Sequence, residues 1–219
     1  MKRMLGEYAT VLRECRRTYK TTGTVTPSSR FLARALSRYV RDGNSQPTGR
    51  RILEVGPGTG PVTRWIIDAL GEQDRLDLVE LNDTFVATLR RRFERDAPFR
   101  AVAGRTRILH RPVQELVGEP PYDLIISGLP LNNFEVDEVE QILDVLRRLV
   151  APGGVVSFFE YIAIRKAKAA VSGRAQRQRL RGVARVVGDF LRQGEIRRDW
   201  ILPNVPPAWV HHVRPHPAM

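Results

Sequence analysis

A glycine-rich turn is the part of the sequence best suited to chemistry. Residues 52–60 read ILEVGPGTG, which places one acidic residue and three glycines in the spacing E-x-G-x-G-x-G: Glu54, Gly56, Gly58 and Gly60. Glycine has no Cβ, so it permits unusual backbone angles and lets the chain touch a ligand. With an apolar strand before the turn and a helix after it, this arrangement would hold a nucleotide-like ligand against the backbone.

A second acidic residue, Glu80, closes the next expected strand, 24 positions after Gly56. A carboxylate offers two acceptor oxygens side by side, which suits the two hydroxyls of a ribose. A dinucleotide-binding turn has the spacing G-x-G-x-x-G, and the third glycine here comes one residue early for it. The combination therefore favours an adenosyl cofactor over a dinucleotide.

The elements that must position these residues alternate between strands and helices. We expect strands near 51–55, 76–80, 106–110, 122–127 and 154–160, and helices near 60–70, 83–95 and 135–150. This alternation predicts an α/β fold with a doubly wound, mostly parallel sheet. Residues 196–202 and 209–213 form a terminal strand pair that includes an antiparallel edge strand. The expected sheet is therefore seven-stranded.

The 219 residues suffice for one sizeable domain with small additions. We divide them into an N-terminal amphipathic basic helix at 1–20, a second helix and linker at 21–48, and a cofactor-binding domain at 49–219. The single cysteine, Cys15, excludes a disulfide framework and a cysteine-built zinc site, and the four histidines show no metal-ligand spacing. No apolar run is long enough for a membrane span, and no secretory signal is present, so we expect a cytoplasmic protein without a metal.

The net charge of +12 is unevenly distributed. Residues 1–20 carry a net +4 and residues 165–198 a net +9, which leaves −1 for the remainder. Positive charge concentrated in two flanking segments indicates a polyanionic partner, either nucleic acid or anionic lipid. The alternative is an arginine-rich chain whose charged helix faces are simply solvated.

The turn at 54–60 resembles motif I of the class I S-adenosylmethionine-dependent methyltransferases. The resemblance implies a Rossmann-like fold, S-adenosylmethionine as cofactor and S-adenosylhomocysteine as product. In that family the glycine loop approaches the amino-acid part of the cofactor, and the acidic residue of motif I helps to position the methionine amino group. These roles correspond to the glycine turn and Glu54, while Glu80 matches the ribose ligand and Leu81 the apolar residue that packs on adenine.

The segment HRPVQ at 110–114 departs from the family pattern. Family members often have Asp or Asn there, which accepts a hydrogen bond from the adenine amino group. Gln114 is the substitute that this chain offers, and the Val113 N–H could reach an adenine ring nitrogen. Ser127 and Leu129, after the fourth expected strand, complete the predicted cofactor contacts.

The segment SGLPLNNF at 127–134 bears on the identity of the methyl acceptor. The rRNA adenine dimethyltransferases carry N-[LI]-P-Y at this point. Ser127 and Leu131 stand where that motif has its Asn and Tyr, so the chain lacks the amide and the stacking ring that would hold a base. Together with TGTVTPSSRFLA at 22–33 and FFEY at 158–161, the segment resembles the bacterial phospholipid N-methyltransferases, which convert phosphatidylethanolamine through mono- and dimethyl forms to phosphatidylcholine.

An ethanolamine ammonium must lose a proton before it can attack, so a carboxylate or phenol is needed beside it. The candidates are Tyr19, Glu160 and Tyr161. The simpler interpretations are an interfacial aromatic residue for Tyr19 and a strand-end salt bridge for Glu160. For the lipid phosphate, Lys20, Arg30 and Arg165 are available, and the sequence singles out none of them.

The resemblance implies a monomeric, peripheral enzyme on the inner face of the cell membrane, with no nucleic acid partner. Residues 3–20 place an apolar stripe between basic flanks, the form of a helix that lies in a membrane interface; a lid packed on the domain is the alternative. For 165–198 we expect apolar positions to face the sheet and arginines to face lipid phosphates. An RNA adenine N-methyltransferase and a non-catalytic lipid-surface module remain as other functions.

Overall fold

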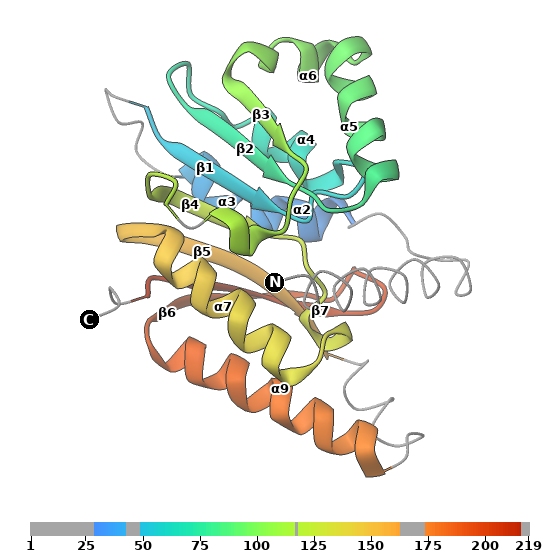
Figure 1. The fold of residues 1–219 in the computed structure, drawn as a ribbon, viewed down its shortest axis with the longest axis vertical. Coiled ribbons are helices and arrows are strands. Elements are labelled where there is room, and N and C mark those ends of the chain that lie inside the picture. Colours follow the sequence, from blue (N-terminus) through green and yellow to red (C-terminus); the bar gives the residue numbers. More distant parts are fainter. Residues whose placement is uncertain (1–28, 43–48, 117, 163–173, 216–219) are drawn as a thin grey trace.

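The computed structural model describes residues 29–42, 49–116, 118–162 and 174–215 (Figure 1). The predicted helix at 1–20, which includes Tyr19 and Lys20, lies outside the described residues, as does the start of the basic segment with Arg165. Within the described ranges no helix is both long and apolar enough to cross a membrane.

Seven strands of the described residues form a single sheet in the order β3-β2-β1-β4-β5-β7-β6 (Figure 1). The first five run parallel: β1 (Arg51–Val55), β2 (Arg75–Val79), β3 (Thr106–Leu109), β4 (Tyr122–Ser127) and β5 (Val150–Tyr161). The last two are β6 (Glu195–Ile201) and β7 (Ala208–Val213), and β7 runs antiparallel to both of its neighbours, β5 and β6. The predicted fold class is therefore confirmed, but the strand that runs against the others, β7, is not at the edge, because β6 lies outside it.

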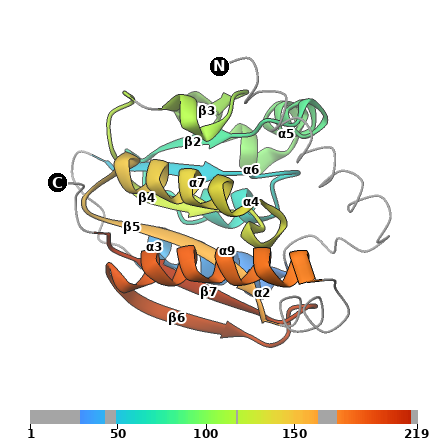
Figure 2. The same cartoon turned by 60° about the horizontal axis from the view of Figure 1, so that its bottom comes forward.

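Helices cover both faces of this sheet (Figure 2). One face is covered by α2 (Arg30–Leu36), α3 (Arg38–Asp42), α4 (Pro61–Ile67), α5 (Asp83–Arg95) and α6 (Ala97–Arg100). The other face carries α7 (Val136–Leu149), α9 (Arg174–Arg192) and the short 3-10 turn η2 (Val113–Leu116). Two further 3-10 turns are η1 (Ala103–Arg105) and η3 (Leu131–Asn133).

Adjacent residues of a strand pack alternately into two hydrophobic cores, one on each face of the sheet. On β1, Ile52 packs with the α2 and α4 side, whereas Leu53 packs with the α7 side. Successive side chains of a strand point to opposite faces, so a strand buried on both faces needs apolar residues throughout. This requirement explains why the central strands read as continuous apolar runs, and why a carboxyl group within one of them, such as that of Glu54, is exceptional.

The strand order reverses between β1 and β4. From β1 the chain moves outward to β2 and β3, then returns to the other side of β1 as β4. Val55, at the carboxyl end of β1, lies level with Val79 of β2 and Ser127 of β4. In open α/β sheets, ligands bind at the carboxyl ends of the strands next to such a reversal. The glycine turn begins at this point.

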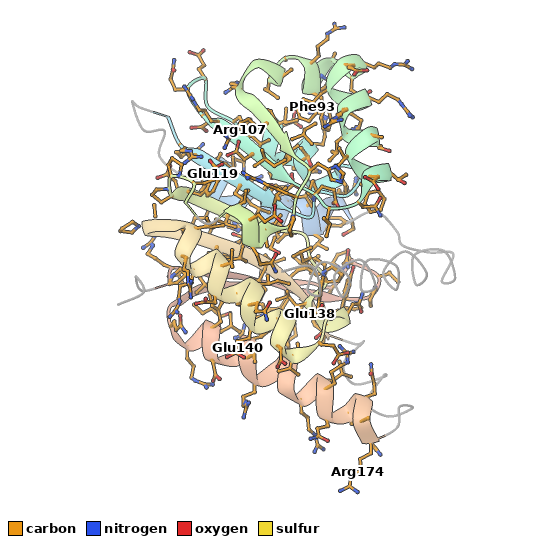
Figure 3. The ribbon with its side chains drawn as sticks, viewed as in Figure 1. Phe93, Arg107, Glu119, Glu138, Glu140 and Arg174 are labelled. Atoms are coloured by element: carbon orange, nitrogen blue, oxygen red, sulfur yellow. The ribbon has the colours of Figure 1, made fainter. Side chains whose placement is uncertain are left out.

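Helix α9 packs as the sequence analysis expected for the part that is described. Leu180, Val183, Val187 and Phe190 are buried, and a Cβ on Gly182 would lie only 2.6 Å from Val136 at the start of α7. Arg174, the first residue of the helix, points away from the sheet (Figure 3). Arg107 and Glu119 lie near the amino ends of the strands, at the edge opposite the glycine turn, where their side chains pair at 3.1 Å (Figure 3).

Candidate functional site

The glycine turn between β1 and α4 is left-handed at Gly56, with φ of +69°, and at Gly58, with φ of +58°. Non-glycine residues rarely adopt these angles. A Cβ on Gly56 would also lie 2.6 Å from the Leu129 Cδ2 atom, whereas a Cβ on Gly58 would meet nothing within 4 Å. Gly56 is therefore fixed by packing against the chain that follows β4, and Gly58 faces open space, as a residue in contact with a ligand must.

The Glu80 carboxylate ties this turn to the end of β2. Its Oε1 atom accepts hydrogen bonds from the N–H groups of Leu81 and Asn82, at 2.9 Å and 2.8 Å, and its Oε2 atom accepts one from the Gly58 N–H at 3.1 Å. Burial raises the pKa of Glu80, although the three N–H donors oppose the shift. Because a carboxylate offers about four lone-pair directions, it retains capacity for a ligand hydroxyl.

Glu54 lies beneath the turn and is almost completely buried. Among the described residues neither of its oxygens has a partner at hydrogen-bond geometry, and Thr63 on α4 lies beside the carboxyl group. Burial raises the pKa of Glu54 to about 8, the charge of Glu80 adds to this, and Thr63 opposes it. A buried carboxyl group without a partner is costly. The site is therefore suited to a ligand that brings a positively charged group.

A pocket opens at the carboxyl ends of β1, β2 and β4. Of the predicted cofactor contacts, six line it: Gly56, Glu80, Leu81, Val113, Gln114 and Leu129. The other four lie around it. Glu54 is below the turn, and Gly58 and Gly60 form the turn itself. Ser127 is next to the lining residue Leu129, whose N–H donates a 3.4 Å hydrogen bond to the Ser127 hydroxyl. The predicted residues thus gather around one pocket.

Several pocket residues were not predicted from the sequence. Phe134 and Ile142 add apolar surface from the end of the SGLPLNNF segment and from α7, and Arg111 and Pro112 line the pocket where the family has an adenine-binding Asp or Asn. The periodic apolar pattern of α7 does not separate a pocket residue such as Ile142 from a core residue. Phe134, by contrast, could have been found, because it ends the segment already suspected of lining the acceptor site.

An arginine of α9 holds this segment in place. The Arg179 guanidinium donates hydrogen bonds to the main-chain carbonyl of Asn132, at 3.2 Å, and to that of Phe134. Leu131, between the pocket and α7, is buried in the core. At least one arginine of the basic segment therefore supports the pocket wall and is not free to face a membrane.

The two described catalytic candidates, Glu160 and Tyr161, face opposite sides of the sheet. They lie two and three residues beyond Phe158, which is level with Ser127 at the end of β4. Tyr161 packs with Phe159, with ring centroids 5.0 Å apart, on the α2 side, and burial raises the pKa of its hydroxyl. The structure therefore does not bring the two candidates to one point.

Glu160 belongs to a chain of acidic groups joined by a histidine. Its Oε2 atom lies 3.4 Å from Nε2 of the buried His211 on β7, and the other ring nitrogen of His211, Nδ1, lies 2.6 Å from Oε1 of Glu195 on β6. The imidazole is stacked on Phe158, with centroids 5.3 Å apart. The Glu160 carboxylate thus lies beside the His211 ring, whose other nitrogen contacts the partly exposed carboxylate of Glu195.

The neighbouring histidine, His212, points to the other face and has a different environment. Its Nδ1 atom lies 2.7 Å from the Ser157 hydroxyl, and its ring meets Tyr39 edge-on with centroids 4.9 Å apart. Burial lowers the pKa of His212 to about 4, so it is neutral at physiological pH. His211 and His212 therefore lie on opposite faces of the sheet, and only His211 approaches a catalytic candidate.

Residues 52–154 match the family described as "Methyltransferase domain". A curated relative, the ornithine lipid N-methyltransferase of Singulisphaera acidiphila, is 32% identical over 131 residues; the alignment covers 60% of this chain and 66% of that protein, just under two thirds of its length.

Solved structures show the same fold at low identity. The O-methyltransferase TomG of Streptomyces achromogenes, in complex with S-adenosylmethionine, gives a TM-score of 0.63 at 17% identity, covering 93% of this chain and 88% of that one. An O-methyltransferase from Bacillus cereus in complex with S-adenosylhomocysteine gives 0.64 at 16% identity, covering 94% of this chain and 90% of that one.

The unpartnered carboxyl of Glu54 and the ribose-compatible carboxylate of Glu80 fit the ammonium and the diol of S-adenosylmethionine, and the apolar pocket wall fits its adenine. The predicted cofactor is thereby confirmed. The family match covers residues 52–154, just under half of the chain, and the fold is one that the chain shares with solved methyltransferase structures.

Proposed function

We propose that this chain transfers methyl groups from S-adenosylmethionine to the amine of phosphatidylethanolamine and of its mono- and dimethyl forms, giving phosphatidylcholine. The observation that carries the proposal is the 32% identity to an ornithine lipid N-methyltransferase. That relative's name supports a lipid as the substrate class and nitrogen as the acceptor atom. The choice of phosphatidylethanolamine rests on the motif resemblance at 22–33, 127–134 and 158–161.

The residues around the pocket would hold the cofactor by complementary charge and shape. Bound S-adenosylmethionine supplies a methyl group on a positively charged sulfur, which an in-line amine lone pair can displace. Glu54 would ionise and pair with the ammonium group, because its buried oxygens have no other partner among the described residues. Glu80 would accept from the ribose hydroxyls, while Leu81, Val113 and Phe134 would pack against adenine.

Glu160 would orient the lipid ammonium and accept its proton. The freed lone pair on nitrogen then forms the new carbon–nitrogen bond as the carbon–sulfur bond breaks, and the electron pair of that bond stays on sulfur. His211 lies 3.4 Å from Glu160 and 2.6 Å from Glu195, which is partly exposed, so it would help to orient the Glu160 carboxylate. In this proposal His211 is a positioning residue, because it acts through Glu160.

The same proposal places the chain as a monomer on the inner face of the cell membrane. Residues 1–20 and 165–198 would supply basic contacts to anionic lipid, and within the described part of that second segment Arg174, Arg177 and Arg181 are exposed. Leu131 is buried in the core, which leaves no ring or amide at this position to stack on a nucleobase. This supports a lipid acceptor over RNA.

Incubation with radiolabelled S-adenosylmethionine tests the proposal directly. The full chain is given mixed micelles that contain phosphatidylethanolamine, an ornithine lipid or phosphatidylglycerol, and a parallel reaction contains structured RNA. We expect label in mono-, di- and trimethylated phosphatidylethanolamine, and none in phosphatidylglycerol, which has no amine. Glu80→Ala is the control for cofactor dependence, since it removes the carboxylate at the cofactor pocket.

Two outcomes would contradict the proposal. Label confined to the ornithine lipid would show that the lipid class is right and phosphatidylethanolamine is wrong. Label in RNA, with no labelled lipid from protein that binds S-adenosylmethionine, would replace the function with RNA methylation.

A further inference from the structure

The turn between β6 and β7 exposes large apolar side chains. Trp200 is 63% exposed, Leu202 64% and Val205 81%. The described residues contain two further exposed large apolar side chains, Phe31 at 42% and Ile196 at 41%. Three of the five therefore lie within residues 200–207, which we call the hairpin tip. Single exposed apolar residues need no explanation, but a group of them marks a contact surface.

The hairpin tip projects from the edge of the sheet at which the cofactor pocket opens. Ala208, which directly follows the tip, pairs with Tyr161 of β5 and with Ile201 of β6. The Ile162 N–H donates a 2.9 Å hydrogen bond to the Pro207 carbonyl. The tip thus continues beyond the carboxyl end of β5, at the same edge as Glu160 and the glycine turn, as the two views show (Figure 1, Figure 2).

The tip is built around a buried polar side chain. Asn204 is only 4% exposed; its Nδ2 atom donates to the Pro206 carbonyl at 2.6 Å, and its Oδ1 atom accepts from the Ser29 N–H at 3.4 Å. Asn204 therefore links the tip to the start of α2. Leu202 and Val205, on either side of it, are held outward by a closed turn with its own hydrogen bonds.

Aromatic and cationic groups surround these apolar side chains. Trp200 meets Trp209 edge-on, with centroids 5.5 Å apart, and the Arg198 guanidinium lies 5.7 Å from the Trp209 ring. The connection through Asn204 brings the first turn of α2 to the tip, where the Arg30 guanidinium lies 4.9 Å from the ring of Phe31. Such a group of residues matches a membrane interface: apolar side chains suit the acyl chains, Trp suits the headgroup layer, and Arg suits the anionic phosphates.

We propose that the hairpin tip, together with Phe31, inserts into the interface of an anionic lipid bilayer and thereby holds the pocket mouth against the membrane. This inference rests on the proposed function, because a lipid substrate gives the surface its partner. It adds a docking element that is separate from the basic segments at 1–20 and 165–198. The exposed apolar side chains of Leu202 and Val205 select the occupant, because a bilayer offers acyl chains that nucleic acid lacks, and the arginines beside the tip complement the lipid phosphates.

Vesicle sedimentation with the full chain tests the inference. Vesicles of phosphatidylglycerol and phosphatidylethanolamine are compared for the wild type, the double variant L202S/V205S and the matched control Ile196→Ser. Ile196 has similar exposure on the same hairpin but lies at its far end, beside Glu195, which pairs with Val213. We expect the double variant to bind roughly tenfold more weakly, because two apolar side chains lose their burial, and the control to bind within about twofold of wild type.

Tryptophan fluorescence supplies a readout of insertion. Emission of the wild type should shift to shorter wavelength on vesicles and be quenched by lipids brominated on their acyl chains, and both changes should be reduced in Trp200→Phe. Equal vesicle binding of the double variant and the wild type would overturn the inference. So would a change from dimer to monomer in the double variant with vesicle binding intact, since the tip would then join two copies.

The two proposals fail in different ways. In mixed micelles, where substrate is delivered without a bilayer, the double variant should methylate lipid at the wild-type rate. Loss of vesicle binding with intact micelle activity supports the docking surface. Absence of lipid methylation by the wild type in micelles would contradict the proposed function, whatever the vesicle result.

Discussion

The two halves of the sheet build their functional groups in different ways. Around β1, β2 and β4 the site is made by backbone turns between neighbours in sequence, and Glu80 is bound to the N–H groups of Leu81 and Asn82 directly after it. Around β5, β7 and β6 the groups come from distant segments, as in the contact of Glu160 with His211 and of His211 with Glu195. In the proposed function the first half would hold the cofactor, and the second would accept the proton.

If this division is real, Glu160→Gln should have the largest effect on catalysis and none on cofactor binding. General acid–base groups contribute about 10²–10⁴-fold to rate, so we expect kcat for lipid methylation to fall by at least about 100-fold. The affinity for S-adenosylmethionine, measured by titration calorimetry, should stay within about twofold of wild type. A matching loss of cofactor affinity would show that the two halves are not separate.

His211→Gln tests whether His211 acts through Glu160. It should reduce kcat less than Glu160→Gln does, while leaving the KM for lipid unchanged. Tyr161→Phe is the matched control, because its hydroxyl belongs to the other face of the sheet. Loss of activity in the Tyr161 variant that equals the loss in the Glu160 variant would reverse the assignment of the proton acceptor.

Glu80→Ala is expected to weaken cofactor binding in the half of the sheet around β1, β2 and β4. The substitution removes a carboxylate that accepts three backbone hydrogen bonds and lines the pocket, and hydrogen bonds to charged groups are worth roughly 1.5–3 kcal/mol each. We expect the affinity for S-adenosylmethionine to fall by about 100-fold. Glu80→Gln keeps the shape and part of the acceptor capacity, so its loss should be intermediate; equal losses would mean that charge alone matters.

Glu54 gives the cofactor half a pH dependence. The pKa of Glu54 is raised to about 8 in the folded protein without ligand, above the ordinary value of a carboxyl group. The stability contributed by the protonated carboxyl is therefore full at acidic pH and is lost as pH rises through about 8. A cofactor ammonium needs the ionised carboxylate. Affinity for S-adenosylmethionine should therefore rise by up to about tenfold between pH 6 and pH 7.

Glu54→Gln should flatten both curves, because it removes the titrating group and keeps its shape. Thermal unfolding without ligand and calorimetry with ligand measure the two effects. A slope that persists in the Gln variant would assign the pH dependence to another group.

The last expected change concerns stability, not activity, and separates packing from backbone angle in the glycine turn. Gly56→Ala and Gly58→Ala both place a side chain at a left-handed residue, but only at Gly56 does the Cβ overlap Leu129. We expect both variants to lose roughly 1 kcal/mol or more from the backbone angle, and Gly56→Ala to lose about 1–3 kcal/mol beyond that from overpacking. Equal denaturant midpoints would show that Leu129 moves aside without cost.

The sequence was informative where function is local. Glu54, the glycines and Glu80 were found from spacing alone because one turn and one strand end place them. The alternation of β-strands also contained information that we did not use, since adjacent residues such as Glu160 and Tyr161 must face opposite sides. The contact between Glu160 and His211 depends on which strand lies beside β5, and nothing local to either residue specifies that neighbour. Ile142 and the exposed hairpin tip likewise required the tertiary structure.

The place of β7 within the sheet has a consequence for the order in which the molecule can be completed. β7 is the last described strand of the chain, yet it lies between β5 and β6. While the ribosome has not yet delivered residues 208–213, β5 is an unpaired edge and β6 has no strand to join. The contact of Glu160 with His211 therefore forms only after residues 208–213 have been synthesised.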